Sequence, residues 1–154
     1  MEGKDFNILY IDDEVHNLVS LKANFRKEYT VFTAESAEEG KKILKENKIQ
    51  IIITDQRMPN ITGIEFLASI LNEYPDPIRI LLTGFADTET VIEAINKGQV
   101  YRYIMKPFNY SELKVTIDNA FEVYFLREKN KELMAEVLKI NEQLEFMLRQ
   151  RLLS

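Results

Sequence analysis

The sequence predicts an α/β protein whose core is a doubly wound sheet of five parallel strands. Two observations support this prediction. Short β-type stretches alternate with stretches in which apolar residues recur at helical spacing, and this pair repeats five times along the chain. Three of the β-type stretches are also continuous apolar runs, which is typical of parallel strands covered by helices on both faces. We therefore expect a crossover helix between each strand and the next.

The predicted strands are rich in Ile, Val, Leu and aromatic residues, as strands generally are. They cover residues 6–11, 29–33, 49–54, 78–83 and 100–105. The first, third and fourth strands are the continuous apolar runs FNILYI, IQIIIT and IRILLT. We expect these three strands to be buried on both faces of the sheet.

Apolar residues at helical spacing predict five helices. The expected helices cover residues 14–27, 36–47, 63–72, 88–96 and 111 to the end of the chain. Ser36 is the expected N-cap of the second helix, and Glu39 would complete a capping box with it. Ser111 is the expected N-cap of the last helix.

Composition excludes several classes of protein. The chain has 154 residues, which suits one domain, and with no Cys and one His it has no disulfide, no thiolate metal site and no His-based zinc site. The net charge of −5 does not favour nucleic-acid binding. No apolar run approaches the ~20 residues that cross a bilayer, and the polar N-terminus lacks the core of a signal peptide. We expect a cytoplasmic protein without direct nucleic-acid or membrane contacts.

Polar residues stand at the carboxyl ends of four predicted strands. They are Asp12 and Asp13, Asp55, Thr83 and Lys106. Because the carboxyl ends of parallel strands meet at one edge of the sheet, where ligands bind, we expect these side chains to converge. Three neighbouring carboxylates repel one another unless a cation is bound. Oxygen ligands without His or Cys favour Mg²⁺.

This combination of groups suits phosphoryl transfer. Asp55 would be the nucleophile that accepts a phosphoryl group as an acyl phosphate, and Mg²⁺ would neutralise charge on the reacting oxygens. Lys106 would pair with one phosphoryl oxygen, and the Thr83 hydroxyl would donate a hydrogen bond to another. No P-loop or GxGxxG motif follows the first strand, so the sequence does not predict a nucleotide site there.

Four motifs in this order closely resemble the receiver domain of two-component response regulators. They are YIDDE at 10–14, TDQRMPNITG at 54–63, LLTGFAD at 81–87 and YIMKPF at 103–108. The resemblance covers roughly residues 5–125. It implies a flavodoxin-like sheet with strand order 2-1-3-4-5. It also implies that a histidine kinase or phosphotransfer protein phosphorylates Asp55.

The resemblance further implies roles for individual residues. Mg²⁺ would be bound by Asp13, Asp55 and the backbone carbonyl of Arg57, with Asp12 acting through water. Thr83 and Tyr103 would be the switch pair. Phosphorylation would draw Thr83 toward the new charge, and the Tyr103 ring would turn inward into the space left behind. The face formed by the fourth helix, fifth strand and fifth helix would then change shape.

The last helix is too long for a receiver domain alone. We therefore predict a receiver over residues 1–125 and a helical extension over residues 126–154. Heptad positions in the extension suit a parallel two-stranded coiled coil, in which Asn130 would fix the register. The predicted dimer residues are Leu126, Asn130, Leu133, Val137, Ile140, Leu144 and Met147. The alternative is a single amphipathic helix packed back on the domain. An output domain beyond Ser154 remains open, as does an output made by the coiled coil itself.

A small phosphatase that forms an aspartyl phosphate is the alternative function. Such an enzyme needs an acid–base group near its nucleophile, commonly two residues after it. Arg57 occupies that position and cannot act as a base. We therefore expect a signalling module that is not an enzyme beyond accepting and slowly losing its own phosphoryl group. Because neither Arg57 nor Phe85 can activate water, we expect the phosphoryl group to persist for about tens of minutes or longer.

Overall fold

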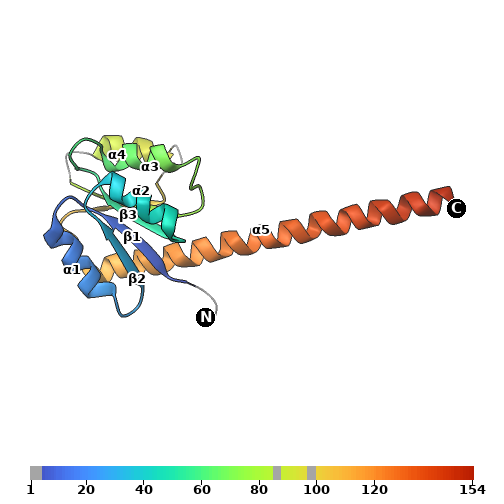
Figure 1. Cartoon of the computed structure of the whole chain (residues 1–154), viewed down its shortest axis with the longest axis horizontal. Coiled ribbons are helices and arrows are strands. Elements are labelled where there is room, and N and C mark those ends of the chain that lie inside the picture. The colour runs from blue at the N-terminus through green and yellow to red at the C-terminus, as the bar shows by residue number, and fades with distance from the viewer. Residues whose placement is uncertain (1–4, 85–87, 97–99) are drawn as a thin grey trace.

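The computed structural model describes residues 5–84, 88–96 and 100–154. Its five parallel strands form one sheet in the order β2-β1-β3-β4-β5, which confirms the predicted fold and strand order (Figure 1). The strands are β1 (Asn7–Ile11), β2 (Thr30–Ala34), β3 (Ile51–Asp55), β4 (Ile78–Thr83) and β5 (Arg102–Met105). The helices are α1 (Val15–Phe25), α2 (Ala37–Glu46), α3 (Gly63–Ile70), α4 (Thr88–Asn96) and α5 (Tyr110–Leu153).

Helices cover both faces of the sheet (Figure 1). Helices α1 and α5 pack on one face, and α2, α3 and α4 pack on the other. Successive residues of β3 point to opposite faces, so Ile51 and Ile53 belong to the first core and Ile52 belongs to the second. Because helices bury both faces of the sheet, the inner strands β1, β3 and β4 consist almost entirely of apolar residues.

At the start of α2, the predicted N-cap is present but the predicted capping box is not. Ser36 caps α2 by accepting a hydrogen bond from the Glu39 backbone, as predicted. The Glu39 carboxylate, however, accepts from the backbone N–H of Glu35, so the predicted capping box is not closed on Ser36. A complete capping box instead starts α3, between Thr62 and Glu65.

The predicted N-cap of the last helix is also wrong. Asn109 caps α5, and its side-chain oxygen accepts a hydrogen bond of 2.7 Å from the backbone N–H of Glu112. Asn is as good an N-cap as Ser. The backbone of Asn109 is still extended, so the helix begins at Tyr110 and Ser111 already lies within its first turn.

Helix α5 has two parts with different surroundings. Its first four turns bury Leu113, Ile117, Ala120, Phe121 and Tyr124 against the sheet. Beyond Phe125 the helix projects away from the domain, and every side chain from residue 129 onward is exposed (Figure 1). The extension therefore does not pack back on its own receiver. Where the helix leaves the domain, Lys131 forms an ion pair of 2.5 Å with Asp76 in the loop before β4.

Among the described residues, no helix combines the length and apolar character needed to cross a membrane.

Gly63 begins α3 where the helix passes close to the end of β3. A Cβ atom there would lie 2.5 Å from the carbonyl oxygen of Asp55 and 2.8 Å from Cδ1 of Leu81. The first neighbour is backbone at the end of a fully buried strand and cannot move freely. The absence of a side chain at Gly63 thus lets α3 pack directly behind Asp55.

We predict that Gly63→Ala destabilises the protein by about 1–3 kcal/mol, the usual cost of inserting atoms into a filled site. Gly84→Ala is the matched control, because no atom of the described residues lies within 4 Å of a Cβ built there. Urea unfolding followed by circular dichroism measures both variants. Equal unfolding midpoints for the two variants would contradict the steric account.

Candidate functional site

Three carboxylates meet at the carboxyl edge of the sheet. Asp12 follows β1 and is fully buried, Asp13 is exposed, and Asp55 ends β3 with 7% of its surface accessible. One oxygen from each carboxylate can be chosen so that all three atoms lie within 4.8 Å of one another. Strands β1 and β3 are neighbours in the sheet, which is why side chains 42 and 43 positions apart in sequence converge here.

Lys106 approaches the three carboxylates from the end of β5, which is the outermost strand of the sheet. It directly follows β5, and its backbone N–H donates to the carbonyl oxygen of Thr83 at the end of β4. Its ammonium nitrogen lies 2.6 Å from Oδ1 of Asp55. Because the Lys106 side chain is 34% exposed and that of Asp55 only 10%, the ion pair lies where the buried site meets solvent.

Burial is the largest influence on Asp55 and raises the pKa of its carboxyl above the ordinary value. The hydrogen bond and charge of Lys106 act in the opposite direction, while the charges of Asp12 and Asp13 raise the pKa further. The net effect is a raised pKa, so Lys106 does not fully offset the burial of Asp55 and the charges of its two acidic neighbours. The site is therefore suited to receive an additional cation.

Asp12 is held by hydrogen bonds that the sequence did not reveal. Its Oδ2 accepts from the Tyr10 hydroxyl at 2.7 Å and from the Asn17 side-chain amide at 3.0 Å, and its Oδ1 accepts from the Glu14 backbone at 3.0 Å. Burial, followed by the hydrogen bond to Asp12, raises the pKa of Tyr10, so the phenol remains a donor. Tyr10 lies in β1 and Asn17 in α1, and the periodicity of the sequence does not indicate that either side chain contacts Asp12.

The predicted switch residues lie on neighbouring strands. Thr83 is fully buried, and its hydroxyl donates to the carbonyl oxygen of Gly84. Tyr103 is half-buried against the core formed with α2, α3 and α4. In the register of β4 and β5, Tyr103 pairs with Leu81 and Thr83 pairs with Met105, so Thr83 and Tyr103 lie two positions apart on the same face.

Of the two residues predicted to set the phosphoryl lifetime, only one can be placed. The Arg57 side chain is exposed in the loop after β3, two residues beyond Asp55. Phe85 lies outside the described residues.

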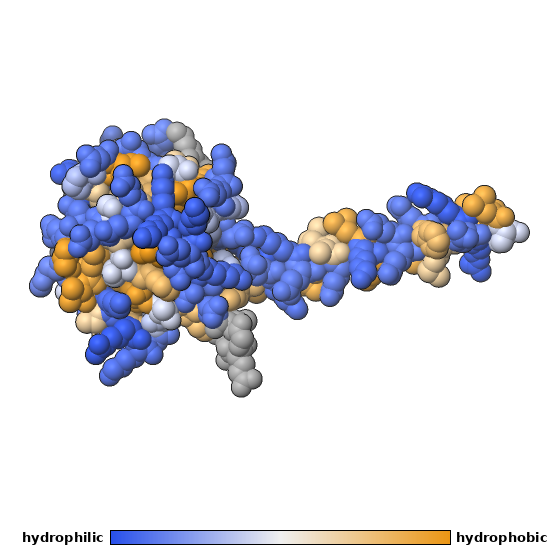
Figure 2. Space-filling model, viewed as in Figure 1, coloured by the Kyte–Doolittle hydropathy of each residue, from blue (hydrophilic) through white to orange (hydrophobic). Residues whose placement is uncertain are grey.

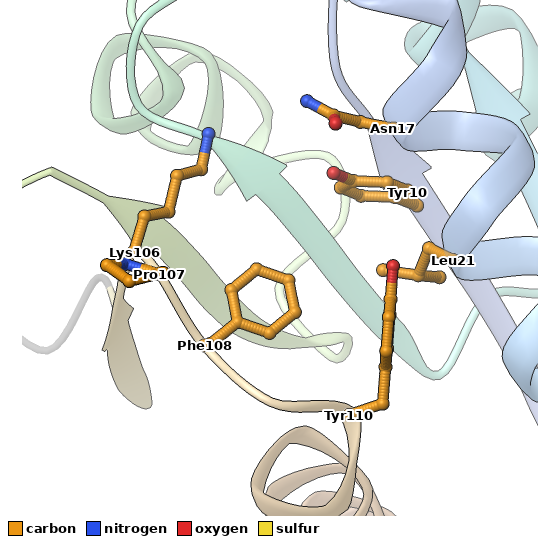
Figure 3. A pocket seen from close by; sticks show the side chains of 7 residues that line it. All are labelled: Tyr10, Asn17, Leu21, Lys106, Pro107, Phe108 and Tyr110. Carbon is orange, nitrogen blue, oxygen red and sulfur yellow. The ribbon is translucent and has the colours of Figure 1, made fainter.

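A pocket of about 230 Å³ opens beside the carboxylates, between α1 and the segment that joins β5 to α5 (Figure 3). Figure 3 shows Lys106 along one side of the pocket and Tyr10 and Asn17 on the opposite side. The remaining lining residues are Leu21, Pro107, Phe108 and Tyr110. The pocket thus has polar groups at the end that faces the carboxylates and apolar or aromatic walls elsewhere.

Comparison with known families agrees with this arrangement. The model of the response regulator receiver domain matches residues 8–118 of the chain. Because the match covers well over half of the 154 residues, the chain belongs to the response regulator receiver family.

Individual relatives include regulators that are much longer. The hydrogenase transcriptional regulatory protein HoxA of Cupriavidus necator is 34% identical over 127 residues, which cover 82% of this chain and 26% of that protein. The chain spans about a quarter of the length of the curated relatives it matches.

Solved structures also match the fold of this chain. One described as adenylate cyclase from Rhodopirellula baltica matches with a TM-score of 0.83 at 32% identity, over 85% of this chain and 98% of that one. The beryllofluoride-activated NtrC4 receiver domain dimer matches with a TM-score of 0.71 at 35% identity, over 77% of this chain and 98% of that one.

We predict that Asp55→Asn raises the melting temperature of the metal-free protein at neutral pH. The raised pKa means that folding favours the protonated carboxyl, so ionised Asp55 costs stability. This cost is absent below the ordinary aspartate pKa and grows as the pH rises through the raised value. The advantage of Asn should therefore shrink in acid.

Thermal melts in EDTA between about pH 4, near the ordinary aspartate pKa, and neutral pH test this prediction. Asp76→Asn is the control, because its carboxylate is exposed and a surface ion pair contributes little to stability. A wild-type protein as stable as Asp55→Asn at neutral pH would contradict the account of the site.

Proposed function

We propose that the chain is a phosphorylation-controlled signalling receiver in which Asp55 accepts a phosphoryl group from a histidine kinase or phosphotransfer protein. One observation supports this most strongly. In a chain of the receiver family, the Lys106 ammonium lies 2.6 Å from the Asp55 carboxylate, at an edge where two further carboxylates converge. We propose no enzymatic activity beyond acceptance and slow loss of that phosphoryl group.

Each group has a part in the transfer. A carboxylate oxygen of Asp55 attacks phosphorus, the P–N bond of the phosphohistidine breaks, and its electron pair leaves with the imidazole nitrogen. The product is an acyl phosphate on Asp55. Lys106, which already contacts Asp55, shifts to a phosphoryl oxygen as a point charge. The Thr83 hydroxyl exchanges its bond with the Gly84 carbonyl for one with another phosphoryl oxygen.

The donor set fits Mg²⁺. Its atoms are carboxylate oxygens close enough to share one ion, and burial together with the charges of Asp12 and Asp13 keeps the pKa of Asp55 raised despite Lys106, which supports a site for a further cation. Asp13, Asp55 and the backbone carbonyl of Arg57 would bind the ion, and Asp12 would act through water. When bound, the ion neutralises charge on the oxygens of the nucleophile and the incoming phosphoryl group.

The proposed signal passes from Thr83 to Tyr103. Movement of Thr83 toward the phosphoryl group frees space on the same face of the sheet, and the half-buried Tyr103 ring turns into that space. The face formed by α4, β5 and α5 then changes shape. Because β5 is followed within five residues by α5, this change is directly connected to the long helix.

We further propose that residues 126–154 form a parallel coiled-coil dimer. The helix carries apolar side chains that nothing in the described chain covers, and Figure 2 shows them as separate apolar areas on the projecting part of α5. At the predicted seam, Leu133, Val137, Ile140, Leu144 and Met147 are each 45–64% exposed in the single chain. A second copy would cover this stripe at the heptad spacing that a two-stranded coiled coil requires.

Phosphorylation should occur at Asp55 alone. Incubation with acetyl phosphate and Mg²⁺ should add one phosphoryl group to the wild-type protein and to Asp76→Asn, whose carboxylate lies in the loop before β4, but none to Asp55→Asn. EDTA should prevent the reaction, because the three carboxylates then repel an anionic donor. Intact-protein mass spectrometry measures the product, and stoichiometric labelling of Asp55→Asn would overturn the proposal.

The same samples give the phosphoryl lifetime once the donor is removed. We expect decay over about tens of minutes or longer, and decay several-fold faster in Arg57→Asn/Phe85→Glu. Loss of the group within seconds in the wild type would contradict the roles given to Arg57 and Phe85.

The dimer can be tested with two substitutions on the same helix. Ile140→Glu, in the predicted seam, should convert the dimer to monomer because two buried carboxylates would face each other. Leu138→Glu should not, because that equally exposed position lies outside the seam. Asn130→Val should raise stability but loosen the choice of oligomeric state.

Sedimentation of these variants, of the full chain and of a chain ending at Phe125 gives the oligomeric state. A full chain that is monomeric at micromolar concentration would count against the coiled coil.

A further inference from the structure

Asp12 is the most deeply buried carboxylate of the site, and its hydrogen bonds are unequally distributed over its two oxygens. Oδ2 accepts from both the Tyr10 hydroxyl and the Asn17 amide, whereas Oδ1 accepts only the Glu14 backbone N–H among the described hydrogen bonds. A carboxylate oxygen offers about two lone-pair positions. Oδ2 is therefore filled by protein donors, and Oδ1 retains one position.

From this asymmetry we propose that Tyr10 and Asn17 are positioning residues for the cation site, which orient Asp12 so that only Oδ1 faces the ion or a water bound to it. The inference rests on the proposed function, because it concerns the same Mg²⁺. It adds two residues to which neither the family motifs nor the composition of the site assigns a role.

The two donors are well placed for this task. Tyr10 lies in β1, only 2% exposed, and its ring is fixed in the core formed with α1 and α5. Asn17 comes from α1, a different element, and approaches the same oxygen. Figure 3 shows the Asn17 side chain next to the Tyr10 hydroxyl, with Lys106 across the pocket. Two donors from separate elements fix the plane of a carboxylate better than one.

The consequence concerns metal affinity. Without Tyr10 or Asn17, the Asp12 carboxylate keeps the Glu14 backbone bond and one donor on Oδ2, so it is less firmly oriented, and ordering it upon binding costs additional free energy. Residues that orient a metal-binding group typically change affinity or activity by about 10–100-fold when removed. We expect Tyr10→Phe, which keeps the ring and removes only the hydroxyl, to weaken Mg²⁺ binding by about tenfold. Asn17→Ala should act in the same direction.

Titration calorimetry with Mg²⁺ alone, without a phosphoryl donor, is the test. Tyr29→Phe is a closely matched control: Tyr29 is also a buried phenol of the same core and donates to a carboxylate, that of Asp118, on α5. Its removal should leave the Mg²⁺ dissociation constant unchanged. Asn17 is only partly buried on a surface helix, so Asn17→Ala gives the answer if Tyr10→Phe does not fold.

A double-mutant cycle separates positioning from a general loss of structure. In an Asp12→Ala background, Tyr10→Phe and Asn17→Ala should no longer change the dissociation constant, since no carboxylate remains to be oriented. Unchanged binding in both single variants, or an equal loss with and without Asp12, overturns the inference while wild-type Mg²⁺ binding and phosphorylation leave the proposed function intact. A wild-type chain that neither binds Mg²⁺ nor is phosphorylated overturns both.

Discussion

The structure depends on one electrostatic constraint. Three carboxylates, those of Asp12, Asp13 and Asp55, lie close together at the carboxyl ends of strands whose faces are covered by helices. Burial raises the pKa of Asp55, its acidic neighbours raise it further, and Lys106 offsets this only in part. The remaining elements hold the groups against their mutual repulsion. The parallel topology brings the ends of β1 and β3 together, and Gly63 lets α3 pack behind Asp55. The site thus holds unfavourable charge that a cation or a positively charged side chain relieves.

The same constraint explains how the site could influence the long helix. Lys106 responds to charge on Asp55, and only Pro107, Phe108 and Asn109 separate it from the first residue of α5. The first turns of α5 are buried in the core, and Lys131 contacts Asp76 where the helix leaves the domain. A displacement of Lys106 would therefore be passed to a helix whose first turns are packed in the core and whose side chains from residue 129 onward are exposed. This arrangement suits the transmission of a local charge change over a long distance.

Sequence reasoning predicted the features that depend on long-range patterns and missed those that depend on local geometry. Continuous apolar strands predicted the parallel sheet, and the strand-end residues Asp55 and Lys106 predicted the place of the site. The strand order followed from the resemblance to receiver domains. Strand and helix limits moved by at most two residues. The N-cap at Asn109 could not be told from one at Ser111, since both residues are good caps. The bonds of Tyr10 and Asn17 to Asp12 depend on side-chain directions, which periodicity does not give.

In the function proposed above, Asp55 and Lys106 together form the phosphoryl-accepting centre. A crystal structure of the chain with Mg²⁺ and beryllofluoride, a phosphoryl analogue that bonds to carboxylates, tests it most directly. We expect an adduct on one Asp55 oxygen, with the Lys106 ammonium moved from the carboxylate to a fluorine atom. An unmodified Asp55 still paired with Lys106, or an adduct on another carboxylate, would contradict it.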